Sequence, residues 1–351
     1  MKGFEELTRV GQIRRVKRLA EEALGRYDLE IVGISPIQHF LNTTFRVEAR
    51  GGQTASAADS TAPTERFCLR MHRSSTQRPG YTYIASELAW LKAIRRDTGL
   101  VVPEPVPARD GSLIVEVGTE GGGAAGPRPC VLFRWVHGSF RGRSLSTSAL
   151  EGVGEFMARL HMHSETFRPP KGFSRPHWDL DGLFGAVLGL DPDKALDALS
   201  TGQRQTIMRV SELVEGAMHR LGRNPDVFGV IHADLHQGNY LFHKGEVRAI
   251  DFDISGWGHY AYDIGVTFSA LQRHPNYLAL REAFLKGYKR RRALPPEQEA
   301  LVDTFKAGFI MGLSLWQAAL LHEPAFGERA RRHVLSRIAV LDDFLQTLGG
   351  A

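Results

Sequence analysis

The stretch VIHADLHQGNYLF, residues 230–242, sets several polar side chains between two apolar runs. These side chains are His232, Asp234, His236 and Asn239. A short acidic segment, Asp251-Phe252-Asp253, follows the second apolar run. Carboxylate and amide oxygens are ligands that suit Mg²⁺, and a further carboxylate can accept the proton of an attacking hydroxyl. The residue types therefore indicate a metal-assisted transfer reaction.

The spacing of the two segments predicts that they meet in space. Two short apolar-patterned runs flank Lys244-Gly245, a pair typical of a two-residue hairpin turn. In that register position 243 faces 246, 241 faces 248, and Asn239 stands across from position 250, beside Asp251. Both oxygen ligands then lie at the open end of one hairpin, with Asp234 in the loop before it. A metal clamp and a positioned base are the parts that phosphoryl transfer needs.

These motifs also carry a family resemblance. HADLHQGN followed by IDFD resembles the aminoglycoside phosphotransferase and choline-kinase-like family, a branch of the protein-kinase-like fold. The segments LRMHR (69–73), SELAWLKAI (86–94), VPEPVP (102–107) and SGWGHYAYDIG (255–265) are similar to the family in type and order. The resemblance covers nearly the whole chain. It implies ATP and Mg²⁺ as cofactors, Asp234 as catalytic base, and Asn239 and Asp251 as metal ligands.

The same resemblance implies roles for the surrounding residues. Asp263 is expected to brace the catalytic loop by accepting backbone hydrogen bonds, and His232 to support the metal loop. Arg70, positioned by Glu87, is expected to contact the nucleotide phosphates. The other predicted nucleotide contacts lie in the first strand turn and in the connector against which the adenine would rest: Asn42, Thr43, Phe133, Arg134 and Val136.

Two features depart from the protein-kinase pattern. Arg70 stands where those kinases have a lysine, and an arginine fork differs in geometry from an ammonium group. The first strand turn, residues 37–44, contains no glycine, although glycine lets backbone amides approach phosphates closely. These departures keep a non-catalytic, pseudokinase-like nucleotide-binding module open as an alternative.

The distance between the two late aspartates bears on the acceptor. Only 263 − 251 = 12 positions separate Asp251 from Asp263, which leaves no room for the long peptide-docking segment of protein kinases. A small-molecule hydroxyl acceptor is therefore expected, with Asp253, Trp257 and His259 as possible acceptor-binding residues. Trp257 and His259 could equally pack the turn. A bacterial Ser/Thr protein kinase of the same fold stays open as an alternative.

Zinc is the competing metal. His232 and His236 are four positions apart, but the zincin pattern needs a glutamate after the first histidine, and Ala233 is there. Both histidines also fall in a loop by the hairpin argument. The spacing therefore does not favour a zinc site.

The elements that must position these residues follow from hydrophobic periodicity. Helices are expected at about 10–24 and 84–96, and strands at about 43–47, 66–72, 112–117 and 130–136, with an extended proline connector at 103–107 and glycine-rich loops at 51–64 and 118–129. From residue 144 the pattern is mostly helical. The chain is therefore predicted as α+β, a two-lobed protein-kinase-like fold. A small antiparallel β lobe with one inserted helix would span 1–136, and a larger, mainly helical lobe 137–351.

The whole chain sets broad limits. Its 351 residues exceed the size at which one core usually stops growing, so two lobes are expected. A net charge of +5 is mild, and nucleic-acid binding is not expected without a clustered basic face. Two cysteines make no disulfide framework, and no segment looks like a signal peptide or a membrane span, so a cytoplasmic protein is expected. The sequence does not fix the oligomeric state.

Overall fold

The computed structural model describes residues 4, 6–39, 42–51, 63–72, 80–118, 127–321 and 327–349. Most of the two predicted glycine-rich loops, residues 52–62 and 119–126, lies outside the described residues. The chain divides into two compact units. Unit 1 comprises Met1–Lys92, Val102–Val136 and Pro170–Ser174, and unit 2 comprises Ala93–Val101, His137–Pro169 and Arg175–Ala351.

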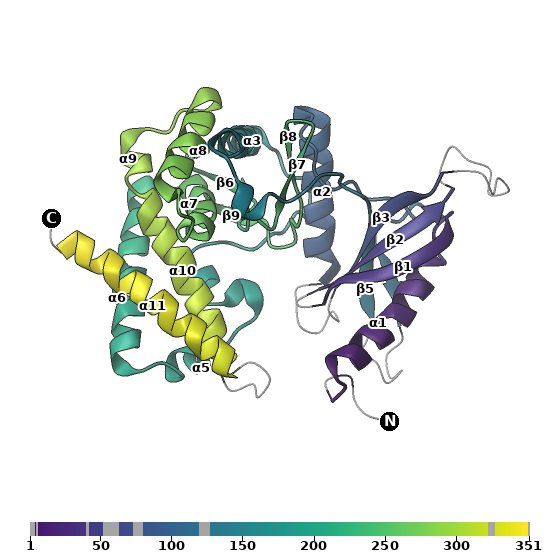
Figure 1. Ribbon diagram of the computed structural model, residues 1–351, viewed down its shortest axis with the longest axis horizontal. Coiled ribbons are helices and arrows are strands. Elements are labelled where there is room, and N and C mark those ends of the chain that lie inside the picture. Colours follow the sequence, from purple (N-terminus) through teal and green to yellow (C-terminus); the bar gives the residue numbers. More distant parts are fainter. Residues whose placement is uncertain are drawn as a thin grey trace. The chain divides into compact units, whose positions relative to one another are not determined.

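Unit 1 is built on a five-stranded antiparallel sheet in the order β1-β2-β3-β5-β4 (Figure 1). The strands are β1 (Glu30–His39), β2 (Thr43–Arg50), β3 (Glu65–Met71), β4 (Val115–Val117) and β5 (Arg128–Arg134). Phe45, Val47 and Ala49 alternate along β2 and are fully buried, as the period of two in a strand requires. The two thiols are not joined: Cys130 is buried in β5, and Cys68 is half-buried in β3.

Helix α1 (Arg9–Leu24) covers one face of this sheet. Thr8 caps its N-terminus by accepting a hydrogen bond from the backbone of Gly11. Val16, Ala20, Ala23 and Leu24 repeat at helical spacing and join the sheet residues in one core. The inserted helix α2 (Gly80–Thr98) follows β3, and its residues belong to unit 1 as far as Lys92 and to unit 2 from Ala93. The proline connector is extended and pairs with β5, since the Val106 amide donates to the Leu132 carbonyl at 2.8 Å.

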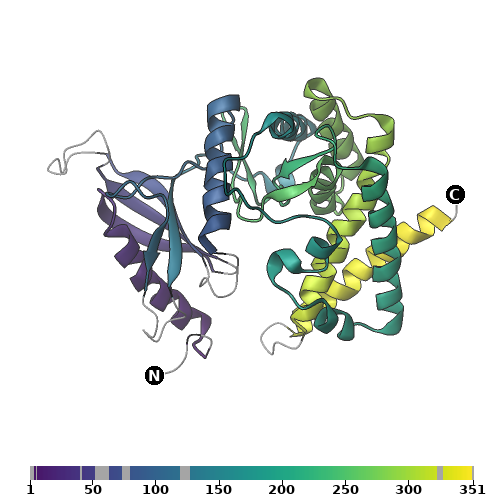
Figure 2. The same ribbon diagram turned by 180° about the vertical axis from the view of Figure 1, so that it is seen from behind.

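Unit 2 is mainly helical, with two small two-stranded sheets (Figures 1 and 2). Its helices are α3 (Thr147–Thr166), α4 (Leu180–Leu183), α5 (Pro192–Asp197), α6 (Thr201–Leu221), α7 (Tyr260–Leu271), α8 (Tyr277–Arg291), α9 (Pro296–Glu299), α10 (Val302–Ala319) and α11 (Gly327–Gly349), with 3₁₀ turns at Gly142–Ser144 and Ala186–Leu188. Strand β6 (Phe228–Ile231) pairs antiparallel with β9 (Gly256–His259), and β7 (Tyr240–His243) with β8 (Glu246–Ala249). None of the described helices is long and apolar enough to cross a bilayer.

Helices α3 and α8 pack unusually closely because each contributes a glycine to the crossing. A Cβ atom at Gly154 would overlap the Phe284 carbonyl oxygen, and one at Gly287 would overlap the Glu151 carbonyl oxygen. Ion pairs line the same seam, with Lys286 lying 3.2 Å from Glu151. The pair of glycines therefore fixes the distance between two helices that both reach the residues described below.

The predicted fold class is confirmed, since a small antiparallel sheet is joined to a larger helical part. Element boundaries shift by a few residues: β2 continues to Arg50, and β4 begins only at Val115. One boundary between the units falls between Val136 and His137. Residues 93–101 belong to unit 2 although their sequence neighbours belong to unit 1, and residues 170–174 belong to unit 1 although their neighbours belong to unit 2.

Candidate active site

A tight hairpin connects the segment that carries Asn239 to the segment that carries Asp251. Lys244 and Gly245 both have positive φ, 49° and 85°, the backbone of a two-residue type I′ turn. His243 pairs with Glu246 in the register predicted from the sequence, and the residue 250 amide donates to the Asn239 carbonyl oxygen at 2.9 Å. Asn239 therefore stands beside the residue that precedes Asp251.

The loop before the hairpin holds Asp234 against Asn239. The Asn239 Nδ2 atom donates to the Asp234 Oδ2 atom and to the Asp234 main-chain oxygen, each at 2.9 Å. The His236 amide donates to that main-chain oxygen as well, at 2.8 Å. Because the amide nitrogen of Asn239 is used in this way, its acceptor end, Oδ1, is the atom suited to a cation.

Burial and neighbouring charges perturb Asp234. Desolvation raises the pKa of this carboxyl well above its usual value, and the negative charges of Asp251 and Asp253 raise it further. The hydrogen bond from Asn239 works in the opposite direction and is the weaker influence. Carboxyl groups that repel one another in this way form a site that a divalent cation would stabilise.

Strained backbone marks the two loops that carry these groups. Ala233 and Asp251 both have φ of 67°, in the left-handed region that costs a non-glycine residue about 1–3 kcal/mol. Asp263, fully buried, accepts hydrogen bonds from the His232 and Ala233 amides at 3.1 and 2.8 Å. These are the backbone contacts expected of Asp263, and they hold the strained backbone at residues 232–233.

His232 joins the loop that carries Asp234 to the residue that precedes Asp251. Its Nδ1 atom accepts from the Asp234 amide at 3.3 Å, so Nε2 carries the proton and donates to the Ile250 carbonyl oxygen at 3.0 Å. Burial lowers the pKa of His232, which keeps the ring neutral. Its ring also packs on Phe252, with centroids 4.4 Å apart. Both ring nitrogens take part in hydrogen bonds to the backbone. This is the arrangement of a residue that supports neighbouring loops, whereas a zinc ligand needs one ring nitrogen for the metal.

A third buried residue, His161 of α3, was not predicted. Its Nε2 atom donates to the Asp263 Oδ2 atom at 3.1 Å, and its Nδ1 atom accepts from the Tyr288 hydroxyl at 2.8 Å. Arg292 donates in turn to that hydroxyl at 3.1 Å. His161 lies 102 positions from Asp263 and 127 positions from Tyr288 in the sequence, so no local pattern could reveal these contacts.

Unit 1 carries the predicted phosphate-binding pair. Arg70 and Glu87 are 5% and 1% exposed, and their side chains form an ion pair at 2.6 Å. The Arg70 guanidinium also lies 5.0 Å from the centre of the Phe133 ring and donates to His72 at 3.3 Å. The pairing predicted from order and spacing is therefore present, and phosphate binding by Arg70 stays a prediction.

The other predicted nucleotide contacts lie in the same unit. Asn42 and Thr43 are 8% and 2% exposed, and the Thr43 hydroxyl is 2.8 Å from His39 Nδ1 across the first turn. Positions 40 and 41 of that turn, like position 73 of LRMHR, lie outside the described residues. Arg134 is exposed and lies 3.4 Å from Glu65, and Val136 is half-buried at the end of the stretch Val102–Val136 of unit 1. Their nucleotide contacts remain predictions.

The possible acceptor residues have mixed surroundings. His259 is 2% exposed, its Nε2 atom donates to the Gly222 carbonyl oxygen at 2.8 Å, and burial lowers its pKa. Trp257, in the same strand, stacks with Phe228 and with His177, with ring centroids 6.3 and 6.4 Å apart. These contacts account for both residues as packing groups, and acceptor binding by them, or by Asp253, stays a prediction.

The oxygen atoms of Asn239 and Asp251 are the candidate ligands for a metal ion. Among the described residues, no group of three or more His, Cys, Asp or Glu side chains has a metal-binding arrangement. Mg²⁺ in nucleotide enzymes takes one or two protein oxygens and completes its shell with phosphates and water. Asn239 and Asp251 fit that requirement by type, because they supply one amide and one carboxylate oxygen from segments that the backbone bond between residues 250 and 239 joins.

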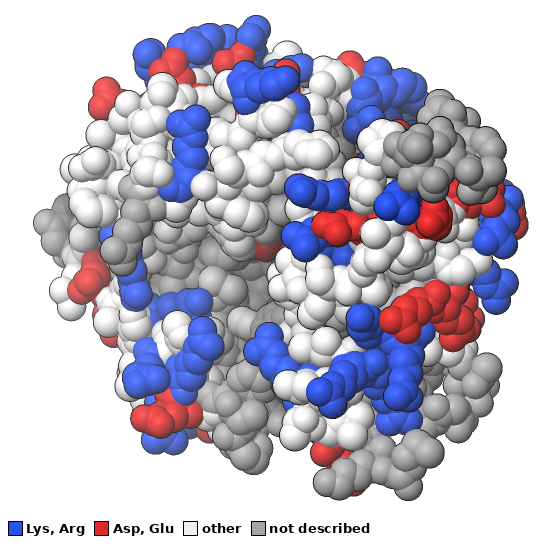
Figure 3. Space-filling view, turned by 45° about the vertical axis from the view of Figure 1, so that its right-hand side comes forward, with Lys and Arg blue, Asp and Glu red and all other residues white. Residues whose placement is uncertain are grey.

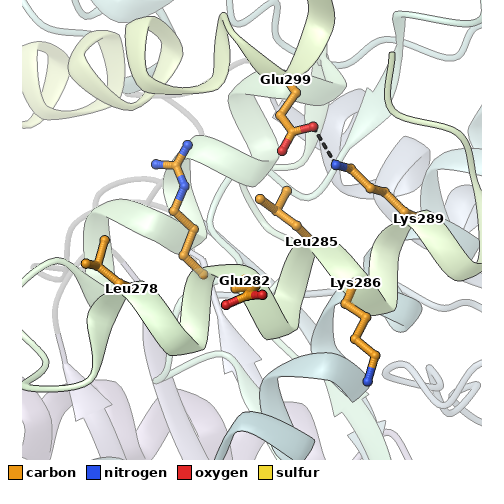
Figure 4. A pocket seen from close by; sticks show the side chains of 7 residues that line it. Leu278, Glu282, Leu285, Lys286, Lys289 and Glu299 are labelled. Carbon is orange, nitrogen blue, oxygen red and sulfur yellow. Dashed lines mark ion pairs between the residues drawn. The ribbon is translucent and has the colours of Figure 1, made fainter. Parts of the chain in front are cut away.

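Other surface features lie apart from this constellation. A hollow along α8 is lined by Leu278, Glu282 and Leu285, with the Lys289–Glu299 ion pair at 2.5 Å on its rim (Figure 4). None of its lining residues belongs to the loops at 232–239 or 251–255. On the face shown in Figure 3, basic side chains gather in several groups, and acidic side chains lie beside some of them.

Comparison with known proteins places the chain in a family. Residues 33–300 match the model of the phosphotransferase enzyme family. An amicoumacin kinase of Bacillus subtilis is 23% identical over 245 residues, which cover 66% of this chain and 68% of that protein. A homoserine kinase of a Caulobacter species is 27% identical over 263 residues, covering 73% and 75%.

Solved structures agree with the sequence relatives. A microcompartment-associated aminopropanol kinase superposes with a TM-score of 0.76 at 28% identity, covering 94% of this chain and 98% of that one. An amicoumacin kinase in complex with AMP-PNP, Ca²⁺ and Ami has a TM-score of 0.75 at 18% identity, covering 93% of each chain, and shows the shared fold. The family match extends over most of the chain, from the sheet of unit 1 to the hairpin and helices of unit 2. The chain belongs to the phosphotransferase enzyme family.

Proposed function

We propose that this protein transfers the γ-phosphoryl group of ATP, with Mg²⁺, to the hydroxyl group of a small molecule. The observation that supports this most directly is the Asn239–Asp234 contact at 2.9 Å, made next to Asp251 by the hairpin. The arrangement combines a carboxylate held for proton transfer with two oxygen ligands for a cation. A cytoplasmic location, where ATP is abundant, belongs to the same proposal.

Each side chain has a defined task in this reaction. Asp234 accepts the proton of the acceptor hydroxyl, and Asn239 fixes its carboxylate through the bond to Oδ2. Asn239 Oδ1 and the Asp251 carboxylate would hold Mg²⁺, which would supply positive charge to neutralise the transferred phosphoryl group. Arg70, held by Glu87, contacts the phosphates. The Asp234 carboxyl, whose pKa is raised by burial and then by the neighbouring carboxylates, would be favoured in its ionised form by a cation held at Asn239 and Asp251, and in that form it can act as base.

The segment after Asp251 supports a small acceptor. Residues 252–255 form a short turn, β9 follows at once, and α7 begins at Tyr260. This described stretch holds no extended segment on which a peptide substrate could dock. The named relatives act on homoserine, amicoumacin or aminopropanol. We therefore place amino alcohols and hydroxy amino acids first among the acceptor classes to be tested.

The deciding experiment is a screen for acceptor-stimulated ADP release. Amino alcohols, hydroxy amino acids, sugars, aminoglycosides and a generic protein substrate are each added to the enzyme with ATP, with and without Mg²⁺. An Mg²⁺-dependent rise with one small hydroxyl compound supports the proposal. Labelling of the protein substrate alone would instead indicate a protein kinase, and binding of ATP without any transfer would indicate a pseudokinase.

The assigned base can be tested by substitution. Asp234→Ala is expected to reduce kcat by about 10²–10⁴-fold, because positioned base catalysis contributes that much. Nucleotide affinity and the melting temperature should change little. Asp251→Ala should instead weaken Mg²⁺-dependent nucleotide binding. Unchanged turnover in Asp234→Ala would remove this residue from the mechanism.

A further inference from the structure

A buried arginine lies against the turn that follows Asp251. Arg175, in the irregular segment between α3 and α4, is 4% exposed. Its Nε atom donates to the Ser255 carbonyl oxygen at 2.6 Å, and its Nη2 atom to those of Phe252 and Asp253 at 3.2 and 2.8 Å. The same Nη2 atom lies 3.0 Å from the Ser255 hydroxyl. These hydrogen bonds therefore all end on residues 252–255.

The choice of an arginine at this place has a physical reason. Burying a charged group costs several kcal/mol unless hydrogen bonds replace its hydration. A planar guanidinium can reach several carbonyl oxygens at fixed angles, whereas a lysine ammonium is a single point on a flexible stem. Arg175 meets this requirement with main-chain oxygens of three residues, so it determines the course of the backbone and not the position of one side chain.

The neighbouring residues extend this clamp. Trp178 donates from its indole Nε1 atom to the Ile254 carbonyl oxygen at 3.0 Å. The Trp257 amide donates to the Pro176 carbonyl oxygen, and the Trp178 amide to the Trp257 carbonyl oxygen, both at 2.8 Å. A Cβ atom at Gly256 would overlap the Pro176 carbonyl oxygen. Residues 175–178 thus lie directly along residues 252–257, and every carbonyl from 252 to 255 accepts a hydrogen bond from Arg175 or Trp178.

Asp251 is anchored on both sides of a strained position. Its φ of 67° persists only where the flanking structure imposes it. On the N-terminal side the Ile250 amide and carbonyl are bound to Asn239 and His232. On the C-terminal side the turn is bound to Arg175.

We propose that Arg175 is a positioning residue for Asp251. By fixing the turn at residues 252–255, it holds the Asp251 carboxylate in the orientation that binds the metal–nucleotide complex. The inference rests on the proposed function and adds to it a residue outside the family motifs. The effect is expected on metal binding, because the hydrogen bonds of Arg175 given above end on the turn that directly follows Asp251.

The test uses AMP-PNP binding to the full chain, measured by calorimetry at increasing Mg²⁺ concentration, so no acceptor is needed. Mg²⁺ should increase the affinity for AMP-PNP, and Arg175→Lys is expected to raise the Mg²⁺ concentration at which half of that increase is reached by about 10–100-fold. This is the usual effect of losing a group that supports a metal ligand. Binding of AMP-PNP without metal should stay as in the wild type. Arg159→Lys is the matched control, since Arg159 also donates to a main-chain oxygen, that of Thr98 at 2.6 Å, but away from the turn.

Each outcome of this experiment supports or overturns the proposed role of Arg175. If Arg175→Lys folds and keeps the wild-type Mg²⁺ dependence, the proposal is wrong. If it does not fold, Trp178→Phe, which removes only the donor to Ile254, must show a smaller rise in the same direction, and an unchanged Mg²⁺ dependence there overturns the proposal. If the wild type itself binds AMP-PNP without any effect of Mg²⁺, the proposed function fails and this inference fails with it. A loss of stability alone, with normal Mg²⁺ dependence, would show a merely structural role.

Discussion

At the scale of single residues, basic and acidic groups with shifted pKa values lie in and around the loop at residues 232–239. His161 and His232 are fully buried, and burial lowers the pKa of each below the ordinary 6.5. The Asp234 carboxyl has a raised pKa for the same physical reason, since burial disfavours its charged form too. The histidines and the carboxylate therefore respond to acid in opposite ways.

The stability of the metal-free protein should fall between pH 6.5 and 5. Below pH 6.5 the unfolded chain takes up protons more readily than folded His161 and His232 do, which costs up to about 1.4 kcal/mol per pH unit for each histidine. Asp234 opposes this loss, because between its ordinary pKa of 3.8 and its raised value the folded state binds the extra proton. Asp234→Asn removes the opposing titration, so its free energy of unfolding should fall more steeply than that of the wild type. Urea unfolding at several pH values measures both slopes, and equal slopes would contradict the assignment.

At the scale of elements, the glycine crossing of α3 and α8 sets the geometry behind the catalytic loop. His161 lies on α3 and Tyr288 on α8, and their hydrogen bond spans the crossing. A change in the distance between the helices would therefore reach Asp263 through His161. The glycines are needed here because the backbones approach too closely for any side chain.

Gly287→Ala is expected to destabilise the protein by about 3 kcal/mol or more, since its methyl group would overlap the Glu151 carbonyl oxygen. Gly216→Ala in α6 is the matched control. Its Cβ atom would meet no other atom within 4 Å, so alanine should stabilise that helix by about 0.5–1 kcal/mol. Thermal unfolding of the two variants measures the contrast. Similar effects of both would show that the crossing tolerates a side chain.

The hairpin turn offers a second prediction. Lys244 has φ of 49°, a conformation that asparagine or glycine adopts more easily at this position of a type I′ turn. Lys244→Asn should therefore stabilise the protein by about 1 kcal/mol. Because the turn lies at the end of the hairpin opposite Asn239, Mg²⁺-dependent nucleotide binding should be unchanged. A shift in that binding would show that the hairpin transmits strain from the turn to the ligands.

Sequence reasoning succeeded where the physics is local. Alternation in β2, helical spacing in α1 and the Lys244-Gly245 turn each depend on neighbours in the chain, and they give the elements and the hairpin register. It failed where a contact joins distant segments without a pattern, as for Arg175 with residues 77–80 positions away and for His161. The edge strand β1 shows no regular burial alternation, and β6 and β9 are only four residues long. None of these three strands therefore has a hydrophobic pattern from which it could be predicted.

At the scale of the whole molecule, the two units are interleaved along the chain. Residues 93–101 belong to unit 2, where Asp97 lies 3.2 Å from His163 and the Thr98 carbonyl accepts from Arg159. A fragment of residues 137–351 lacks these partners. It should unfold at a lower temperature than the matching transition of the full chain.

The control is the full chain cleaved at an engineered protease site between Val136 and His137. It keeps residues 93–101, so its two pieces should stay associated in gel filtration and its unit 2 should melt near the intact value. If the isolated fragment were as stable as the cleaved protein, residues 93–101 would contribute nothing to unit 2.

The interleaving also sets an order for folding during synthesis. Unit 1 includes Pro170–Ser174, so its last segment is made 174 − 136 = 38 residues after Val136. At translation rates of about 5–20 residues per second, that delay is roughly 2–8 s. Unit 1 must therefore wait on the ribosome without the segment whose Ser174 amide donates to the Ser86 hydroxyl of α2 at 2.9 Å. A nascent chain stalled before residue 170 should be the one that chaperones bind and proteases cut most readily.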